Sequence, residues 1–166
     1  LYISFFCLLM MDFYKDFTFC VCNTICFSTG YFLHLVVIMC IWFNDTMAYI
    51  VGSLIGRTPL SKISPKKTWE GTIGGVILCA TAMAFLYPEV FYSMNSTAIA
   101  FFFASVALIA AVTGTFGDLL ESKLKRSAGV KDSGSLMPGH GGFLDRFDSL
   151  LLATPFVWLY VQLFLK

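Results

Sequence analysis

The sequence predicts an all-α protein, a polytopic transmembrane helical bundle with candidate catalytic loops facing the cytosol. Of its 166 residues, 58% are hydrophobic and only 13% are charged, with a mean hydropathy of +0.79, whereas soluble domains are about a quarter charged. Four apolar runs approach the ~20 residues that a helix needs to cross a bilayer. Nine of the eleven Lys and Arg residues lie in two short windows, 57–67 and 123–146. The net charge of +1 provides no overall field that would attract nucleic acid.

The four apolar runs span residues 31–55, 72–92, 98–116 and 150–165. The first run contains Asp45, which we interpret as an intramembrane carboxylate and hence a functional residue. An alternative is that Asp45 lies at a water-exposed helix end. The second and third runs form a hairpin whose connection, residues 88–96, has no Lys or Arg. Both basic windows then lie on one side, which the positive-inside rule predicts to be the cytoplasm.

Residues 1–30 are also apolar, but Asp12, Lys15 and Asp16 divide them into short pieces. A further crossing near residues 17–27 is an open alternative, whereas the pattern of a signal peptide is absent. We therefore divide the chain into an unassigned segment, 1–30, and a membrane catalytic domain, 31–166. Because the chain begins with Leu, we expect it to be the C-terminal part of a longer protein. The six cysteines lie in apolar surroundings and are interpreted as core or lipid-facing residues.

The first basic window reads GRTPLSKISPKKTWEGTIGG, residues 56–75. Pro59 and Pro65 predict an ordered loop or turn, and Ser64 or Thr68 is suited to cap a helix that starts near Glu70. Free amides at a helix start attract anions. With two adjacent lysines, this window predicts a phosphate site, although a juxtamembrane basic patch that contacts anionic lipid is an alternative.

The second window begins where the third apolar run ends. Asp118, Glu121 and Lys125 have helical i, i+3, i+7 spacing and would share one face, either as an ion-pair stripe or as a platform for metal and phosphate. Arg126 follows, and Gly129 is expected to end the helix. Further on, the sequence PGHGG around His140 predicts a tight loop whose free amides suit phosphate.

Asp145 and Asp148 stand three residues apart at the start of the last helix. This spacing places both carboxylates on one face, and Mg²⁺ is commonly held by one or two carboxylates together with water and substrate phosphate. The pattern indicates metal-assisted phosphoryl or nucleotidyl transfer. The alternative is that both are N-terminal helix charges that interact with the helix dipole.

These motifs carry a resemblance to a known family. The stretch KRSAGVKDSGSLMPGHGGFLDRFDS is similar to the signature of the CDP-diacylglycerol synthases, or phosphatidate cytidylyltransferases. NDTMAYIVGSLIGRTPLSKISPKKTWEGTIGG resembles a second block shared by that family. The blocks cover residues 44–75 and 117–149 in the expected order, with the hydrophobic hairpin between them, and the bacterial form is the more similar.

The resemblance implies an integral membrane enzyme, facing the cytosol of a bacterial inner membrane, that joins CTP to phosphatidate and releases pyrophosphate. It implies Mg²⁺ as the cofactor, with room for a second cation, and it is compatible with a homodimer. Carried over by position, the metal ligands are Asp145, Asp148, Asp118 and Asp45. The catalytic set is Asp145, Asp148, Asp118, Lys125 and Arg126. The residues that bind substrate phosphates are Lys66, Lys67, Lys131, His140, Gly141, Gly142 and Arg146.

Two other functions remain open. A CTP-dependent lipid kinase of the dolichol type would transfer the γ-phosphoryl group and leave CDP. A catalytically inactive membrane scaffold would bind Mg²⁺ and CTP weakly or not at all. Product analysis separates the kinase from the cytidylyltransferase.

Overall fold

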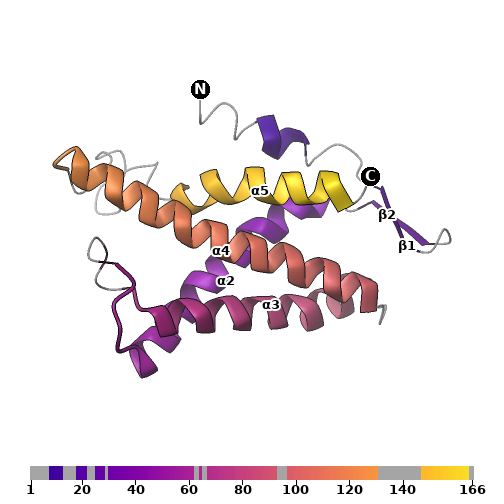
Figure 1. Ribbon diagram of the computed structural model, residues 1–166. Coiled ribbons are helices and arrows are strands. Elements are labelled where there is room, and N and C mark those ends of the chain that lie inside the picture. Colours follow the sequence, from indigo (N-terminus) through magenta and orange to yellow (C-terminus); the bar gives the residue numbers. More distant parts are fainter. Residues whose placement is uncertain are drawn as a thin grey trace.

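The computed structural model describes residues 8–12, 18–21, 25–28, 30–61, 64, 67–92, 97–130 and 147–164. Four long helices make up most of it (Figure 1). They are α2 (Gly30–Ile55), α3 (Trp69–Tyr92), α4 (Thr97–Ser127) and α5 (Asp148–Phe164). Each coincides with one of the four predicted apolar runs, and α4 continues about three turns beyond residue 116, as the spacing of Asp118, Glu121 and Lys125 predicts. The predicted helices are therefore confirmed within the residues that the structure describes from Gly30 onward.

The helices pack in chain order, α2 on α3, α3 on α4 and α4 on α5, with further contacts from α2 to α4 and α5. Figure 1 shows α3 and α4 returning on each other as a hairpin, with α2 crossing behind them. Their shared core consists of small and branched side chains, including Val37, Cys40, Cys79, Val106 and Val157, none of which is exposed. Burial of these apolar side chains supplies the main stabilisation, about 1.5–3 kcal/mol for each large aliphatic residue.

Two glycines allow the close helix crossings on which the site depends. A Cβ atom at Gly71 would lie 2.6 Å from the carbonyl oxygen of Ala48, at the crossing of α3 with α2. A Cβ atom at Gly117 would lie 2.8 Å from the carbonyl oxygen of Asp148, at the crossing of α4 with α5. Both separations are shorter than real Cβ contacts, so any side chain there would force the helices apart.

The N-terminal part contains a feature that the sequence did not predict. Strands β1 (Thr18–Val21) and β2 (Ile25–Ser28) form an antiparallel ribbon in which Cys20 pairs with Cys26. The region around residues 17–27, considered above for a further crossing, thus contains strands instead of a helix. Residues 8–12 form a short helical segment, and Asp12 Oδ2 accepts a hydrogen bond of 2.8 Å from Trp158 Nε1 of α5.

Two helical stretches, Leu33–Ile55 and Ile99–Ser127, are long and apolar enough to cross a membrane. The apolar stretches of α3 and α5, Trp69–Phe85 and Asp148–Leu163, are shorter. Many large apolar side chains on these helices are exposed, among them Trp42, Leu54, Phe85 and Phe101. These findings indicate a membrane protein. Cys40 and Cys79 are buried free thiols between α2 and α3, which agrees with the interpretation of cysteines as core residues.

Candidate functional site

The connection between α2 and α3 folds back on itself as a short hairpin. The Leu60 amide donates a 2.7 Å hydrogen bond to the Lys67 carbonyl, and the Trp69 amide donates a 3.0 Å bond to the Thr58 carbonyl. Pro59 and Thr68 form an antiparallel bridge between these two bonds. The predicted ordered turn is therefore confirmed around Pro59, and the backbone of Lys67 is held in a fixed position.

Glu70 anchors one arm of this hairpin to the start of α3. Its carboxylate accepts a 2.7 Å hydrogen bond from the Thr58 hydroxyl, and bonds of 3.2–3.3 Å from the backbone amides of Thr58 and Arg57. The bond from the Thr58 hydroxyl and those from nearby backbone amides lower the pKa of Glu70 to about 2. Glu70 is therefore ionised at any physiological pH.

Thr68 caps α3. Its Oγ1 accepts a hydrogen bond of 3.2 Å from the Gly71 amide, which is the expected contact between an N-cap residue and the third helical position. Of the two predicted caps, Thr68 is confirmed. Ser64 instead accepts a 3.2 Å hydrogen bond from the Lys67 amide through its backbone carbonyl.

Lys67 forms an ion pair with Asp118 of α4. Both side chains are about one-quarter exposed, at 29% and 26%. The pair joins the first basic window to the part of α4 just before the second, although 51 residues separate Lys67 and Asp118 in sequence, because α3 and α4 return to the same end of the bundle. The described part of the second window, residues 123–130, therefore lies at the same end of the bundle as the first window (Figure 1), and residues 131–146 lie outside the described ranges.

The last turns of α4 carry the predicted charged face. Lys125 Nζ lies 3.5 Å from Glu121 Oε1, one turn beyond Asp118. Gly129, just beyond the end of α4 at Ser127, has a left-handed φ of 70°. The Gly129 amide donates a hydrogen bond to Arg126 O, and the Val130 amide donates one to Lys125 O. This is a Schellman motif, and it confirms the predicted helix end. Arg126 is exposed on the final turn.

Asp148, the first residue of α5, lies beside Asp118 because α4 and α5 cross closely at Gly117. Burial and the neighbouring negative charge of Asp118 raise the pKa of Asp148 to about 7. Asp148 Oδ1 accepts hydrogen bonds from the Ser149 amide at 2.6 Å and the Ser149 hydroxyl at 3.3 Å. Two carboxylates crowded in this way favour a cation between them.

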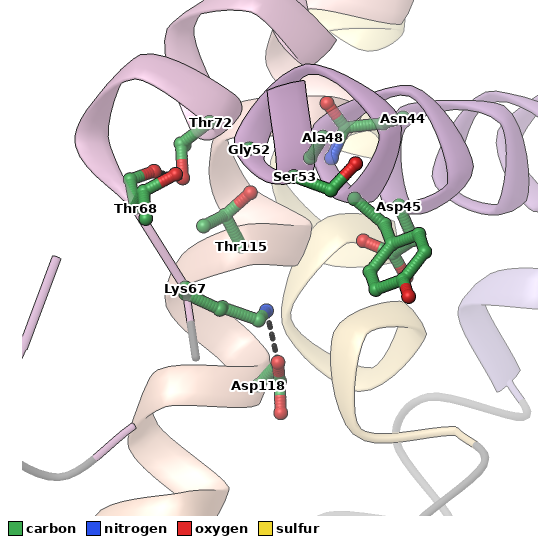
Figure 2. A pocket seen from close by; sticks show the side chains of 11 residues that line it. Asn44, Asp45, Ala48, Gly52, Ser53, Lys67, Thr68, Thr72, Thr115 and Asp118 are labelled. Carbon is green, nitrogen blue, oxygen red and sulfur yellow. Dashed lines mark hydrogen bonds and ion pairs between the residues drawn. The ribbon is translucent and has the colours of Figure 1, made fainter. Parts of the chain in front are cut away.

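A cavity of about 380 Å³ opens between α2, α3 and α4, with Lys67 and Asp118 in its wall. Figure 2 shows Lys67 reaching across to Asp118, with Thr68, Thr72 and Thr115 near it and α2 supplying the facing wall. The α2 side consists of Asn44, Asp45, Ala48, Tyr49, Gly52 and Ser53. Asp45 therefore faces the same cavity as the ion pair, as its interpretation as a functional carboxylate requires.

Asn44 is the most unusual residue in the cavity wall. Its side chain is only 2% exposed, and Oδ1 has no hydrogen-bond partner within the described part of the chain. An unsatisfied buried acceptor costs about 1–3 kcal/mol, so such a group is explained by backbone strain, a functional role, or a bound water or ion. Because Asn44 lines the cavity, a donor or cation bound there is one way to satisfy this oxygen.

The donor set fits Mg²⁺. Over the described ranges, no group of three or more His, Cys, Asp or Glu side chains is arranged to hold a metal. Mg²⁺ needs no such group, because it is usually held by one or two carboxylates and completes its shell with water and phosphate oxygens. Asp118 and Asp148 supply such a pair, and Asp45 and Asn44 supply further oxygen atoms nearby.

The structure brings together Lys67, Asp118, Asp148 and Asp45. Lys125 and Arg126 lie about two turns farther along α4, and Lys125 contacts Glu121. The remaining predicted residues lie outside the described ranges; these are Lys66, Lys131, His140, Gly141, Gly142, Asp145 and Arg146.

Sequence reasoning missed Asn44, Ser53, Thr72 and Thr115 as cavity residues. Asn44 had a signal, since it is a second polar residue beside Asp45 in an apolar run. The two threonines had none, because Thr is common in apolar helices, where its hydroxyl bonds to a carbonyl of its own helix.

The anchoring role of Glu70 predicts a kinetic effect. Glu70→Ala removes the acceptor for Thr58 and the two amides, so the hairpin loosens and Lys67 loses its fixed position. We expect activity to fall about tenfold to a hundredfold, with partial recovery in Glu70→Gln, which keeps one oxygen acceptor. Because the pKa of Glu70 is about 2, the loss should be constant between pH 5 and 9; kcat and KM measured across that range would show it. A loss that varies with pH would contradict the anchoring role.

This chain is similar in sequence to a group of known proteins. A sequence model of the group described as "Cytidylyltransferase family" matches residues 1–164, including the N-terminal 30 residues that were left unassigned above. "Phosphatidate cytidylyltransferase" of Thermotoga maritima is 38% identical over 166 residues, which cover 98% of this chain and 57% of that protein. The protein of the same name from Synechocystis sp. is 42% identical over 84% of this chain and 46% of its own length.

A plant protein is similarly related. "Phosphatidate cytidylyltransferase 4, chloroplastic" of Arabidopsis thaliana is 45% identical over 74% of this chain and 30% of its own length. The chain thus spans between about a third and somewhat more than half of these curated relatives. Bacterial and chloroplast proteins are similar to this chain at comparable levels.

Proposed function

Because this chain belongs to the cytidylyltransferase family, we propose that it transfers CMP from CTP to phosphatidate, forming CDP-diacylglycerol and pyrophosphate. One observation carries the proposal: Lys67, Asp118 and Asp148 meet at one end of the helix bundle, beside a cavity. Both substrates are polyanions, so a site that joins them needs cations aimed at their phosphates. The names of the relatives supply the identity of the substrates.

The charged residues of the site, together with Asn44, each have a role in this reaction. Asp118 and Asp148 hold Mg²⁺, with Asp45 and the Asn44 carbonyl oxygen available to a second cation or to its water ligands. When bound, Mg²⁺ neutralises phosphate charge and orients the reacting groups. Lys67 exchanges its contact with Asp118 for a phosphate oxygen as the carboxylate engages the cation. The phosphatidate phosphate itself is the nucleophile toward the α-phosphorus of CTP, so the protein supplies no covalent nucleophile.

The residues outside the described ranges complete the proposed site. Asp145 is a further metal ligand, and Lys66, Lys131, His140, Gly141, Gly142 and Arg146 bind the phosphates of CTP and phosphatidate. Lys125 and Arg126 extend the positive charge toward the mouth of the site. These roles rest on the resemblance of the two sequence blocks and on the neighbouring positions of Lys67 and Asp118.

We place the enzyme in a membrane as a multi-pass protein with its site on the cytosolic side. Two helices meet the length and composition of a crossing, and the charged ends of α3 and α4 lie together. Under the positive-inside rule, the end that carries the Lys and Arg windows faces the cytosol. This arrangement keeps the acyl chains in hydrocarbon while the lipid phosphate meets the charged residues.

A label-transfer assay tests the reaction. Membranes that contain the chain are incubated with phosphatidate, Mg²⁺ and CTP labelled with ³²P at the α- or γ-position, and the lipid is then extracted. We expect label in lipid from α-labelled CTP only, and only with both phosphatidate and metal present. Label in lipid from γ-labelled CTP would indicate the lipid kinase, and no transfer together with no CTP binding would indicate the scaffold.

A further inference from the structure

A second cavity of about 480 Å³ adjoins the proposed active site. It lies along the α3–α4 pair, under the hairpin that joins α2 to α3. Its volume is within the range of ~300–1,000 Å³ that is typical of ligand pockets. Most of its wall is hydrocarbon, and the residues used in the following argument are Leu60, Trp69, Ile73, Ile77 and Phe116.

Two threonines connect this apolar cavity to the charged one. Thr72 of α3 and Thr115 of α4 line both cavities. Each hydroxyl donates to a carbonyl of its own helix, Thr72 to Thr68 at 3.0 Å and Thr115 to Ala111 at 2.8 Å. The boundary between the cavities thus consists of two small side chains whose polar groups are already satisfied.

The hairpin that positions Lys67 also covers the polar end of the apolar cavity. Leu60 lines the cavity, and its amide is bonded to the Lys67 carbonyl at 2.7 Å. From Trp69 to Ile77 the α3 wall extends about 12 Å away from this end. Lys67 lines the charged cavity, which shares Thr72 and Thr115 with the apolar cavity. A cation next to an apolar cavity is the arrangement that an amphiphile with an anionic head and an apolar tail requires.

Large apolar side chains of the wall are open to the surroundings. Trp69, Ile73, Ile77 and Phe116 are 53%, 53%, 57% and 61% exposed. We propose that this cavity binds an acyl chain of the lipid substrate while the lipid phosphate lies in the charged cavity near Lys67. The proposal rests on the function proposed above. It assigns the α3–α4 face to the acyl tail. It assigns the boundary between the two cavities, formed by Thr72 and Thr115, to the glycerol backbone.

A pair of neighbouring substitutions tests the tail site. Ile77→Trp fills the cavity, whereas Leu78→Trp adds the same bulk at the adjacent α3 position, which is 42% exposed and does not line the cavity. With dioleoyl phosphatidate we expect Ile77→Trp to raise KM about tenfold, equivalent to loss of burial of about two methylene groups. The KM for CTP and the KM for dihexanoyl phosphatidate should change less than twofold. Leu78→Trp should match the unsubstituted chain for all three substrates, and equal effects of the two variants would overturn the proposal.

Photolabelling provides a readout that does not require turnover. Phosphatidate with a diazirine in its acyl chain is added at low mole fraction to detergent micelles that contain the full chain, and labelled peptides are mapped. We expect label on residues 69–77 and 112–119 that excess phosphatidate removes and phosphatidylcholine does not. Ile77→Trp should reduce this label, and Leu78→Trp should not.

The two experiments separate failure of the tail site from failure of the proposed function. Competed label on these residues without any transfer from CTP would keep the tail site and reject the proposed reaction. Transfer from CTP with label spread evenly over the helices would reject the tail site alone. If residues 69–77 take up no label even without competing phosphatidate, the tail site is also rejected, because another polypeptide segment or a second copy would then cover this face.

Discussion

Asp148→Asn is expected to reduce CDP-diacylglycerol synthesis by at least ~10²–10³-fold, the range seen when a single charge-stabilising group is removed from an active site. Asp148 and Asp118 are the adjacent carboxylates of the described site, and an amide is a much weaker ligand for Mg²⁺. The synthesis rate is measured with saturating CTP and phosphatidate over a range of Mg²⁺ concentrations. We expect that added Mg²⁺ does not restore the rate.

Stability measurements distinguish this catalytic effect from unfolding. Asp148 is partly buried next to the negative charge of Asp118, so removal of its charge relieves repulsion. The melting temperature of Asp148→Asn in detergent should therefore be equal to or higher than that of the unsubstituted chain. Asp12→Asn is a matched control, because it removes a carboxylate that contacts Trp158 instead of the site. Near-normal activity in Asp148→Asn would reject its assignment as a metal ligand.

Lys67→Ala is expected to raise the KM for a substrate about tenfold to a hundredfold, with a smaller effect on kcat. Among the residues that the structure describes, Lys67 supplies the cation that lines the cavity. Charge-assisted contacts to phosphate are worth about 1.5–3 kcal/mol. Initial rates at varied CTP and varied phosphatidate would show which substrate is affected. Higher ionic strength should weaken binding by the unsubstituted chain more than by the variant.

Two further variants define the role of Lys67. Lys67→Arg keeps the positive charge and should recover part of the affinity, although its planar group has a different geometry. Lys123→Ala removes an exposed lysine of the second basic window that does not line the cavity, and it should leave KM unchanged. The loss of the partly exposed ion pair with Asp118 should lower the free energy of unfolding by about 1 kcal/mol. Equal KM effects in Lys67→Ala and Lys123→Ala would show that only total charge matters.

The helices could be predicted from sequence because they depend on long apolar runs with strong end signals. Gly129 ends α4 in the predicted manner, and Thr68 begins α3 as its cap. The extension of α4 to Ser127 was anticipated from the spacing of Asp118, Glu121 and Lys125. The β1–β2 ribbon was not, because its residues are apolar on both faces and lack the polar alternation that identifies a half-buried strand.

The candidate site was predictable in its charged residues and not in its geometry. Asp118, Asp148 and Lys67 stood out because charge is rare in so apolar a chain. Their meeting depends on the close crossing at Gly117 and on the hairpin held by Glu70. Neither contact can be read from a single sequence, since each involves backbone atoms from distant segments. The apolar cavity was equally invisible, because its residues resemble any other membrane-facing side chains.

The most direct test measures pyrophosphate and CDP-diacylglycerol in the same reaction, for the unsubstituted chain and for Asp148→Asn. A cytidylyl transfer at the site of Lys67, Asp118 and Asp148 predicts one pyrophosphate for each CDP-diacylglycerol, dependent on both CTP and phosphatidate. Both products should disappear together in Asp148→Asn. Formation of CDP with a phosphorylated lipid, or unchanged formation of both products in Asp148→Asn, would contradict the proposed reaction or its site.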